Sequence, residues 1–236
     1  MGTITTPPLK KFALRIYTKI NGPSISTLNK LVEALKGEYT ETIRLQLIPS
    51  VGPKGELFIT PLQFVSKTED HILLIFEDAI FFDYKQYESW DIIFPKIFNT
   101  FLIIANILSI STIERIALDY IDLFDNFSQK IKEPIPVFFK IKIDIPPELN
   151  VAFDDFTLGI KIDTGNPNHI SIMRLRCLPP ENDEYHKIQL ESYYTIKETI
   201  EIDKIDLLKT NLNTAHSTLI EKFWSILNDK TISIIK

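Results

Sequence analysis

Residues 113–124, IERIALDYIDLF, alternate like a strand yet carry four charged side chains: Glu114, Arg115, Asp119 and Asp122. Converging carboxylates could bind a metal or exchange protons, so the spacing of these acids is decisive. In a regular strand Arg115 and Asp119 share a face about 13 Å apart, while Asp122 points to the other face with Tyr120. The acids do not converge. The sequence therefore predicts a central scaffold strand, with no metal site.

The histidines and the cysteine give no other catalytic pattern. The four histidines, His71, His169, His186 and His216, have no partner at a metal-ligand spacing such as H-x-x-x-H. His216 lies between two apolar stripes of a helical segment and is interpreted as a boundary residue. Cys177 is the only cysteine, so no disulfide can form within the chain and no cysteine zinc site is available.

Nucleotide-binding patterns are also weak. The segment GPKGE at 52–56 lacks the Walker A spacing and its Ser/Thr, and it is typical of a hairpin turn. An aromatic group precedes a helix: Phe81, Phe82, Tyr84, Tyr87 and Trp90. These rings could stack on bases, but no Arg or Lys is interleaved with them, which favours packing in a core or an interface. The sequence predicts no catalytic, cofactor-binding or metal-binding residue, and no enzyme.

The elements that would position these residues follow from periodicity and turn residues. A helix after residue 24 is capped by Ser24 or Ser26 and ends at Gly37, and Ser89 and Asp203 cap two longer helices. The other two helices occupy about 90–108 and 204–226. Strands are expected at 12–18, 42–48, 57–65, 71–84 in two pieces, 113–124, 137–145, 156–164, 170–178 and 187–196.

The two halves of this order are similar. Residues 1–110 give a strand, a helix, four strands and a helix, and residues 111–236 repeat that order with a short or missing first helix. We therefore predict an α+β protein of two pseudo-repeated antiparallel sheets, each with a long helix, packed as one unit. This duplication resembles the TATA-binding-protein-like architecture. The alternative is a single helix-grip sheet around one helix.

Charge and apolar segments restrict the partners. The net charge of −5 falls entirely in residues 111–236, which disfavours general binding to nucleic acid, although a local basic groove stays open. The apolar stretch 92–108 is interrupted by Pro95, Lys96 and Asn99, which argues against a membrane span. With no apolar leader near the start and one cysteine, the sequence favours the cytosol.

The helix at 92–108 is apolar on nearly all sides. Ile103 and Ile107 widen its apolar surface beyond the stripe that would pack on a sheet, so another part of the chain or another chain should cover them. If the second half of the chain covers them, the protein can be monomeric; otherwise a dimer or a partner protein is expected. The candidate interface or structural residues are Trp90, Ile103, Ile107, Arg115, Asp119, Tyr120, His216 and Trp224.

Four motifs resemble a sporadically distributed family of uncharacterised bacterial and archaeal proteins of about 250 residues. They are PPLKKFALRIY at 7–17, YESWDIIFPKI at 87–97, IERIALDYID at 113–122 and AHSTLIEKFWSILNDK at 215–230. Arg115 fits the central arginine of that family, whereas Asp119 and Asp122 depart from its pattern. The resemblance implies no activity, and the patchy distribution associates such genes with mobile or defence loci.

Together these observations predict a non-enzymatic, protein-binding accessory, adaptor or antitoxin-like subunit of a bacterial defence or mobile-locus system. Its expected partner is another protein of the same locus or a second copy. The alternative is a cytosolic ligand- or nucleic-acid-binding module that uses a concave sheet.

Overall fold

A computed structural model of the chain describes residues 9–21, 23–40, 50–51, 57–58, 62–85, 87–124, 139–141, 156–178, 187–229 and 231–232. The strand expected at 42–48, most of the strand at 137–145, the turn at 52–56 and His186 lie outside these residues.

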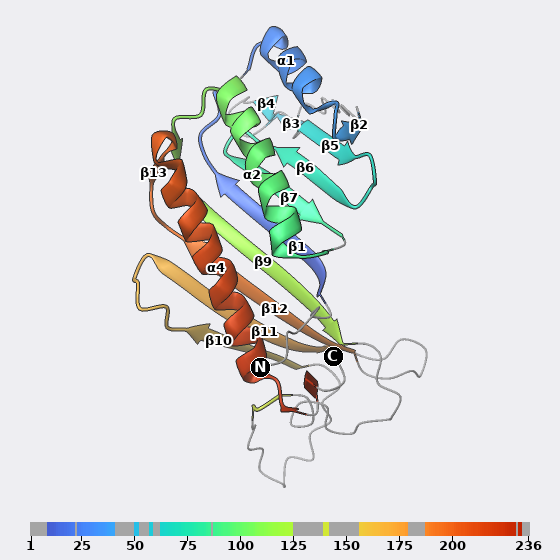
Figure 1. Cartoon of the computed structure of the whole chain (residues 1–236), viewed down its shortest axis with the longest axis vertical. Coiled ribbons are helices and arrows are strands. Elements are labelled where there is room, and N and C mark those ends of the chain that lie inside the picture. The colour runs from blue at the N-terminus through green and yellow to red at the C-terminus, as the bar shows by residue number, and fades with distance from the viewer. Residues whose placement is uncertain are drawn as a thin grey trace.

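The first half of the chain contains two helices and seven strands in the described residues (Figure 1). They are β1 (Leu9–Tyr17), α1 (Ile25–Leu35), β2 (Tyr39–Thr40), β3 (Ser50–Val51), β4 (Leu57–Phe58), β5 (Leu62–Ser66), β6 (His71–Ile75), β7 (Ala79–Tyr84) and α2 (Trp90–Ile107). The second half contains β8 (Thr112–Ile113), β9 (Arg115–Phe124), β10 (Phe156–Ile162), β11 (His169–Leu178), β12 (Lys187–Ile196), β13 (Ile200–Glu201), the 3-10 turn η2 (Ile202–Lys204) and α4 (Ile205–Ile226).

Nine of these strands form one antiparallel sheet in the order β10-β11-β12-β9-β1-β7-β6-β5-β2. The α+β class is therefore confirmed. The expected division into two separate sheets is wrong, because β1 pairs with β9 along its length, with Leu14 opposite Leu118. This pairing satisfies the backbone groups of two apolar strands that would otherwise be exposed edges. The helix-grip alternative also fails in detail, since more than one helix covers the single sheet.

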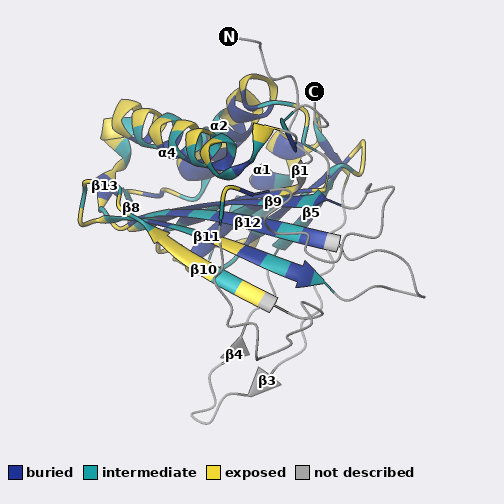
Figure 2. Ribbon diagram, turned by 90° about the horizontal axis from the view of Figure 1, so that it is seen from below, coloured by how far each residue is buried: buried dark blue, intermediate teal, exposed yellow. Residues whose placement is uncertain are grey.

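The described helices all lie on one face of the sheet (Figure 2). Apolar side chains that alternate along the central strands point to this face and are buried: Phe12, Leu14, Ile16, Ile116, Leu118 and Tyr120. They join residues of α1, α2 and α4 in the main core, and a second cluster surrounds Phe124, Met173 and Phe223. No described helix covers the opposite face, which is called the open face below.

Local signals explain where the helices begin and end. The Ser24 hydroxyl accepts a hydrogen bond from the backbone N–H of Thr27 at 3.1 Å, as an N-cap residue should. Ser89 occupies the N-cap of α2 without a side-chain cap, and Pro95 lies within the helix near its start. Asp203 does not cap α4, because it falls inside the turn η2 and Lys204 precedes the helix.

The end of α2 is an αL turn made by a residue other than glycine. Ser109 has φ of 54°. Its backbone N–H donates to Asn106 at 3.4 Å, and that of Ile110 donates to Ala105 at 2.9 Å. This is the Schellman pattern, which usually places glycine at the αL position.

Among the described helices, α2 alone is long and apolar enough, by length and composition, to cross a membrane. In this structure it packs on the sheet between α1 and α4, with buried residues from Trp90 to Ala105 (Figure 1). Core helices commonly have this composition.

Candidate functional site

The structure divides the predicted residues between two faces of the sheet. Trp90, Tyr120 and His216 come together on the helix face, where α2 and α4 lie side by side. Arg115 and Asp119 lie on the open face, as the strand periodicity predicts. Because the sheet separates the two groups, they belong to different sites.

The group on the helix face is called the α2–α4 polar cluster and contains Tyr87, Trp90, Tyr120, Asp122, Asn213 and His216. The Trp90 indole stacks on the His216 ring at 4.5 Å, and its Nε1–H donates to Asn213 Oδ1 at 2.8 Å. Tyr120 Oη lies 2.7 Å from His216 Nδ1. These contacts connect the start of α2, the middle of α4 and β9.

Asp122 is the least expected member of the α2–α4 polar cluster. It follows Tyr120 on the helix face, is 2% exposed, and its Oδ1 has no hydrogen-bond partner among the described residues. Burial raises its pKa to about 8. Tyr87 packs edge-on against Tyr120, and burial raises its pKa to about 12. The sequence gives one sign of this burial: Asp122 follows the apolar residues of β9 at the two-residue spacing of a strand, so it lies on the same face as they do.

The α2–α4 polar cluster has the character of a structural network. Burial lowers the pKa of His216 to about 4 and raises that of Tyr120 well above its ordinary value, so both groups are neutral at pH 7. Neither His216 nor Tyr120 has a pKa near the working pH, where a general acid or base works best. Asp122 and Tyr120 are also buried beneath the helices, which leaves a substrate no described path to them.

The open face carries a different constellation. Among its described side chains are six basic residues, Lys11, Arg15, Arg115, Lys161, Arg174 and Arg176, and three acidic residues, Asp83, Asp119 and Glu191. These nine are called the open-face charge band. Its six positive and three negative side chains give a local excess of positive charge in a chain of net charge −5.

Asp119 is buried at the centre of this band. Arg15 Nη1 lies 2.5 Å from Asp119 Oδ2, an ion pair without hydrogen-bond alignment. Burial raises the pKa of Asp119 to about 6, against the opposing effect of Arg15 and with a further contribution from Glu191. Lys11 pairs with Asp83 at 2.9 Å on the neighbouring strands.

Glu191 on β12 is the second buried acid of the open-face charge band. It accepts hydrogen bonds from Tyr193 Oη at 2.5 Å and from Gln189 Nε2 at 2.7 Å. Arg176 Nε lies 3.2 Å from its Oε1, and Arg174 Nη1 lies 4.0 Å from its Oε2. One carboxylate thus holds two arginines in place on β11.

The pairs are asymmetric in their exposure. The side chains of Arg15, Arg174 and Arg176 are 36%, 45% and 41% exposed, whereas Asp119 and Glu191 are 6% and 5% exposed. The acids therefore lie under the sheet surface and the guanidinium groups reach solvent. A molecule that approaches this face meets positive charge first.

Arg115 differs from the other arginines of the open-face charge band. Its guanidinium lies over the Tyr17 ring at 3.6 Å, and no ion pair joins it to a described acid. Arg15 lies 5.6 Å from the Phe81 ring, and Arg174 lies 5.3 Å from the Tyr193 ring. The alternation of polar residues along β1, β11 and β12 indicates one polar face on each strand. It does not show which residues of neighbouring strands lie opposite one another, because that pairing depends on the register of the sheet.

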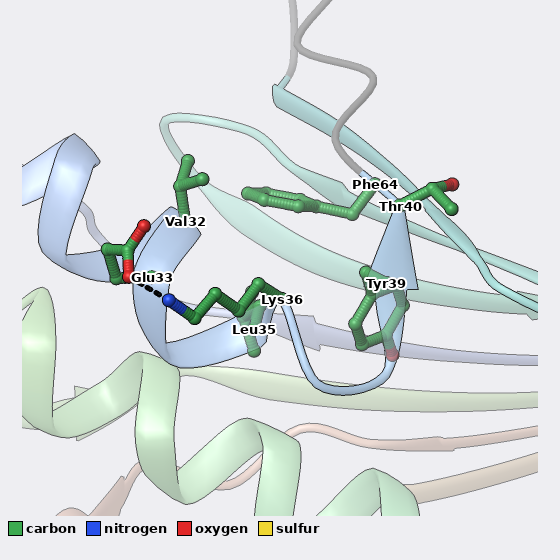
Figure 3. Close-up of a pocket in the computed structure, with 7 residues that line it drawn as sticks. All are labelled: Val32, Glu33, Leu35, Lys36, Tyr39, Thr40 and Phe64. Atoms are coloured by element: carbon green, nitrogen blue, oxygen red, sulfur yellow. Dashed lines mark hydrogen bonds and ion pairs between the residues drawn. The ribbon is translucent and has the colours of Figure 1, made fainter.

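A third polar group lies near the edge of the sheet. His71 Nδ1 is 2.7 Å from Asp70 Oδ1, and its Nε2 is 3.1 Å from Tyr39 Oη. Tyr39 also borders a cavity of about 90 Å³ between α1, β2 and β5 (Figure 3). Its lining residues are Val32, Glu33, Leu35, Lys36, Tyr39, Thr40 and Phe64.

This cavity is poorly equipped for chemistry. Lys36, the C-cap residue of α1, is paired with Glu33, as the dashed line in Figure 3 shows. Burial raises the pKa of Tyr39 well beyond its ordinary value, so its hydroxyl is a poor nucleophile or base. We interpret the contact between His71 of β6 and Tyr39 of β2 as structural, because it holds these two strands together.

The remaining predicted residues belong to the helices. Ile107 packs against the main core, and Trp224 packs edge-on against Phe223 in the second cluster. Ile103 is 39% exposed and Ile92 is 47% exposed. Two polar residues of α2, Lys96 and Asn99, lie between them on the outer face, so the two isoleucines do not form a continuous apolar patch.

No group of three His, Cys, Asp or Glu side chains that could hold a metal ion occurs in the described part of the chain. No protein-family model and no curated protein matches the sequence.

Proposed function

We propose that the protein is a non-enzymatic, cytosolic binding module whose open sheet face takes an anionic partner. The observation that carries this proposal is the asymmetry of the ion pairs. Exposed Arg15, Arg174 and Arg176 lie above the buried acids Asp119 and Glu191. The absence of a described helix over this face supports the same reading (Figure 2).

The proposal rests on local charge and not on net charge. The whole chain is acidic, so electrostatic attraction would act on an anion only near the open-face charge band. Salt screens exposed charges over about 8–10 Å, which confines the effect to that face. Affinity for a polyanion should therefore fall steeply with salt and depend on basic residues of this face alone.

Heparin, a polyanion without bases, tests the proposal. Arg115→Gln and Lys161→Gln each remove one open-face charge without leaving a described buried acid unpaired. Lys209→Gln removes one charge from exposed α4 and is the matched control. We expect each open-face variant to weaken heparin binding about three- to tenfold, and the control to change nothing. Equal effects of all three variants would overturn the proposal.

A second candidate function is the protein-binding accessory or antitoxin-like subunit of a defence or mobile-locus system, with a locus partner or a second copy bound on the helix side. The observation in its favour is the exposure of Ile92 and Ile103 on α2, which Lys96 and Asn99 separate. We include in this proposal that the chain belongs to the family of uncharacterised bacterial and archaeal proteins that its four sequence motifs resemble. Light scattering of the wild type and of the double variant Ile92→Lys/Ile103→Lys tests whether a second copy of the chain binds there. If it does, the wild type should be a dimer and the double variant a monomer.

We also propose that residues 1–110 and 111–236 are structural repeats. In each half the first strand lies beside the last strand of that half, and the preceding strands follow outward in reverse chain order. The two orders are β1-β7-β6-β5 and β9-β12-β11-β10. Each half then ends in a long helix on the same face (Figures 1 and 2). Superposition of the two four-strand units with α2 and α4 tests this, and opposite helix directions would reject it.

A further inference from the structure

We propose that the anionic partner of the open face is a single-stranded nucleic acid, an inference that rests on the proposed function. Charge alone would suit any polyanion. The additional observation is that three of the arginines contact aromatic rings: Arg115 over Tyr17 at 3.6 Å, Arg174 by Tyr193 at 5.3 Å, and Arg15 by Phe81 at 5.6 Å.

These contacts matter because they hold planar groups at the surface. A guanidinium placed over a ring keeps its charge and still offers a flat outer surface. Exposed bases stack on aromatic rings and on guanidinium planes, and such stacking tolerates any base. Tyr17, Phe81, Tyr193 and Arg115 are all half-buried, so each still has a surface open to a ligand.

The pairs lie along a path across the sheet. They belong to β7, β1, β9, β12 and β11, which are consecutive neighbours in the strand order. With strands about 4.8 Å apart, the path is roughly 19 Å wide, which suits a few nucleotides and exceeds one small ligand. Tyr193 is opposite Asp119 on β9, and Arg174 is opposite Glu191, so the path passes over both buried acids.

Small residues separate these larger side chains. Ala13 on β1 is opposite Asp119, and Ala117 on β9 lies between Arg115 and Asp119 and is opposite Arg15. On β10, a Cβ added to Gly159 would meet no atom within 4 Å. The two alanines are 8% and 7% exposed, so neighbouring side chains already cover them, and the open space on this face lies beside Gly159. In a double helix the faces of the bases are already stacked on one another, so a duplex could not stack on these rings and would bind mainly through its phosphates.

The binding experiment compares four labelled probes by fluorescence anisotropy. They are a mixed-sequence DNA single strand of about 12 nucleotides, an abasic strand of the same length, a duplex of the same length, and heparin. We expect the single strand to bind at least about tenfold more tightly than the abasic strand and the duplex. Equal affinity for the single and abasic strands, or for the single strand and the duplex, would overturn the inference.

A charge-preserving variant separates stacking from electrostatics. Arg115→Lys keeps the charge but loses the planar guanidinium, and Tyr17→Leu removes the ring beneath it. We expect both variants to weaken single-strand binding about three- to tenfold and to leave heparin binding within twofold of wild type. Circular dichroism confirms that each variant is folded, and Lys209→Gln serves as the control.

The results distinguish the two proposals. If heparin binds through the open face and the single strand gains nothing from its bases, the inference fails while the proposed function stands. If neither heparin nor the single strand binds, both fail. If Arg115→Lys weakens heparin and single-strand binding equally, stacking is excluded and the inference fails.

Discussion

Replacing Asp122 with Asn should stabilise the protein, and the gain should grow with pH. Asp122 is 2% exposed, and no described group bonds to its Oδ1. Its folded pKa is about 8, against an ordinary value of 3.8 in the unfolded chain. An acid with a raised folded pKa favours the folded state below its unfolded pKa, and that stability is lost as pH rises toward the folded pKa.

The size of this effect follows from linkage. Each unit of pKa difference corresponds to about 1.4 kcal/mol. Between about pH 5 and pH 8 the unfolded chain carries an ionised Asp122 while the folded chain keeps it protonated. The wild type should therefore lose at most roughly 3–4 kcal/mol through this group over that range. Asn has the same shape without a titrating proton, so Asp122→Asn avoids this loss.

Urea unfolding at a series of pH values measures the effect. Asp119 also titrates in this range, but it is present in both proteins and cancels in their difference. Glu114→Gln is the control, since Glu114 is exposed. We expect the advantage of Asp122→Asn to increase by about 2–4 kcal/mol from pH 5 to pH 8. A difference that does not change with pH would show that Asp122 is solvated or paired, and would refute the reasoning.

Three further predictions concern other parts of the fold. Ser109→Gly should raise the free energy of unfolding by about 0.5–1 kcal/mol, because Ser109 has φ of 54°, and thermal unfolding measures this. Ile103→Lys should leave the protein folded because Ile103 is 39% exposed, whereas Ile107→Lys should cost about 2 kcal/mol or more because Ile107 packs against the core; unchanged melting of both would contradict the packing described. Asp119→Asn should release Arg15 and tighten heparin binding at pH 7.5, and the gain should disappear below about pH 6, where wild-type Asp119 is itself protonated. Heparin titrations at both pH values test this, and a gain independent of pH would reject it.

Local sequence patterns predicted the elements well. The bounds of β9, β11 and β12 fall within two residues of the expected strands, because apolar residues alternate there and turn residues flank them. Ser24 caps α1 for the same local reason. The union of both halves into one sheet was not predicted, since the β1–β9 pairing joins residues about 100 positions apart and no local signal specifies it.

The candidate site was only partly accessible from the sequence. The periodicity of β9 placed Arg115 and Asp119 on one face correctly. Their actual partners, Tyr17 and Arg15, come from β1 and depend on register. Asp122 was seen as pointing away from Asp119, but its burial depends on how α2 and α4 cover β9, which is a tertiary property.

Ultraviolet cross-linking of a single-stranded oligonucleotide, followed by mass-spectrometric mapping of the linked peptides, tests the central claim most directly. We predict cross-links on the open face, at Tyr17 of β1, Phe81 of β7 and Tyr193 of β12, that disappear at high salt. Cross-links concentrated on α1, α2 or α4, with none on these three strands, would contradict it.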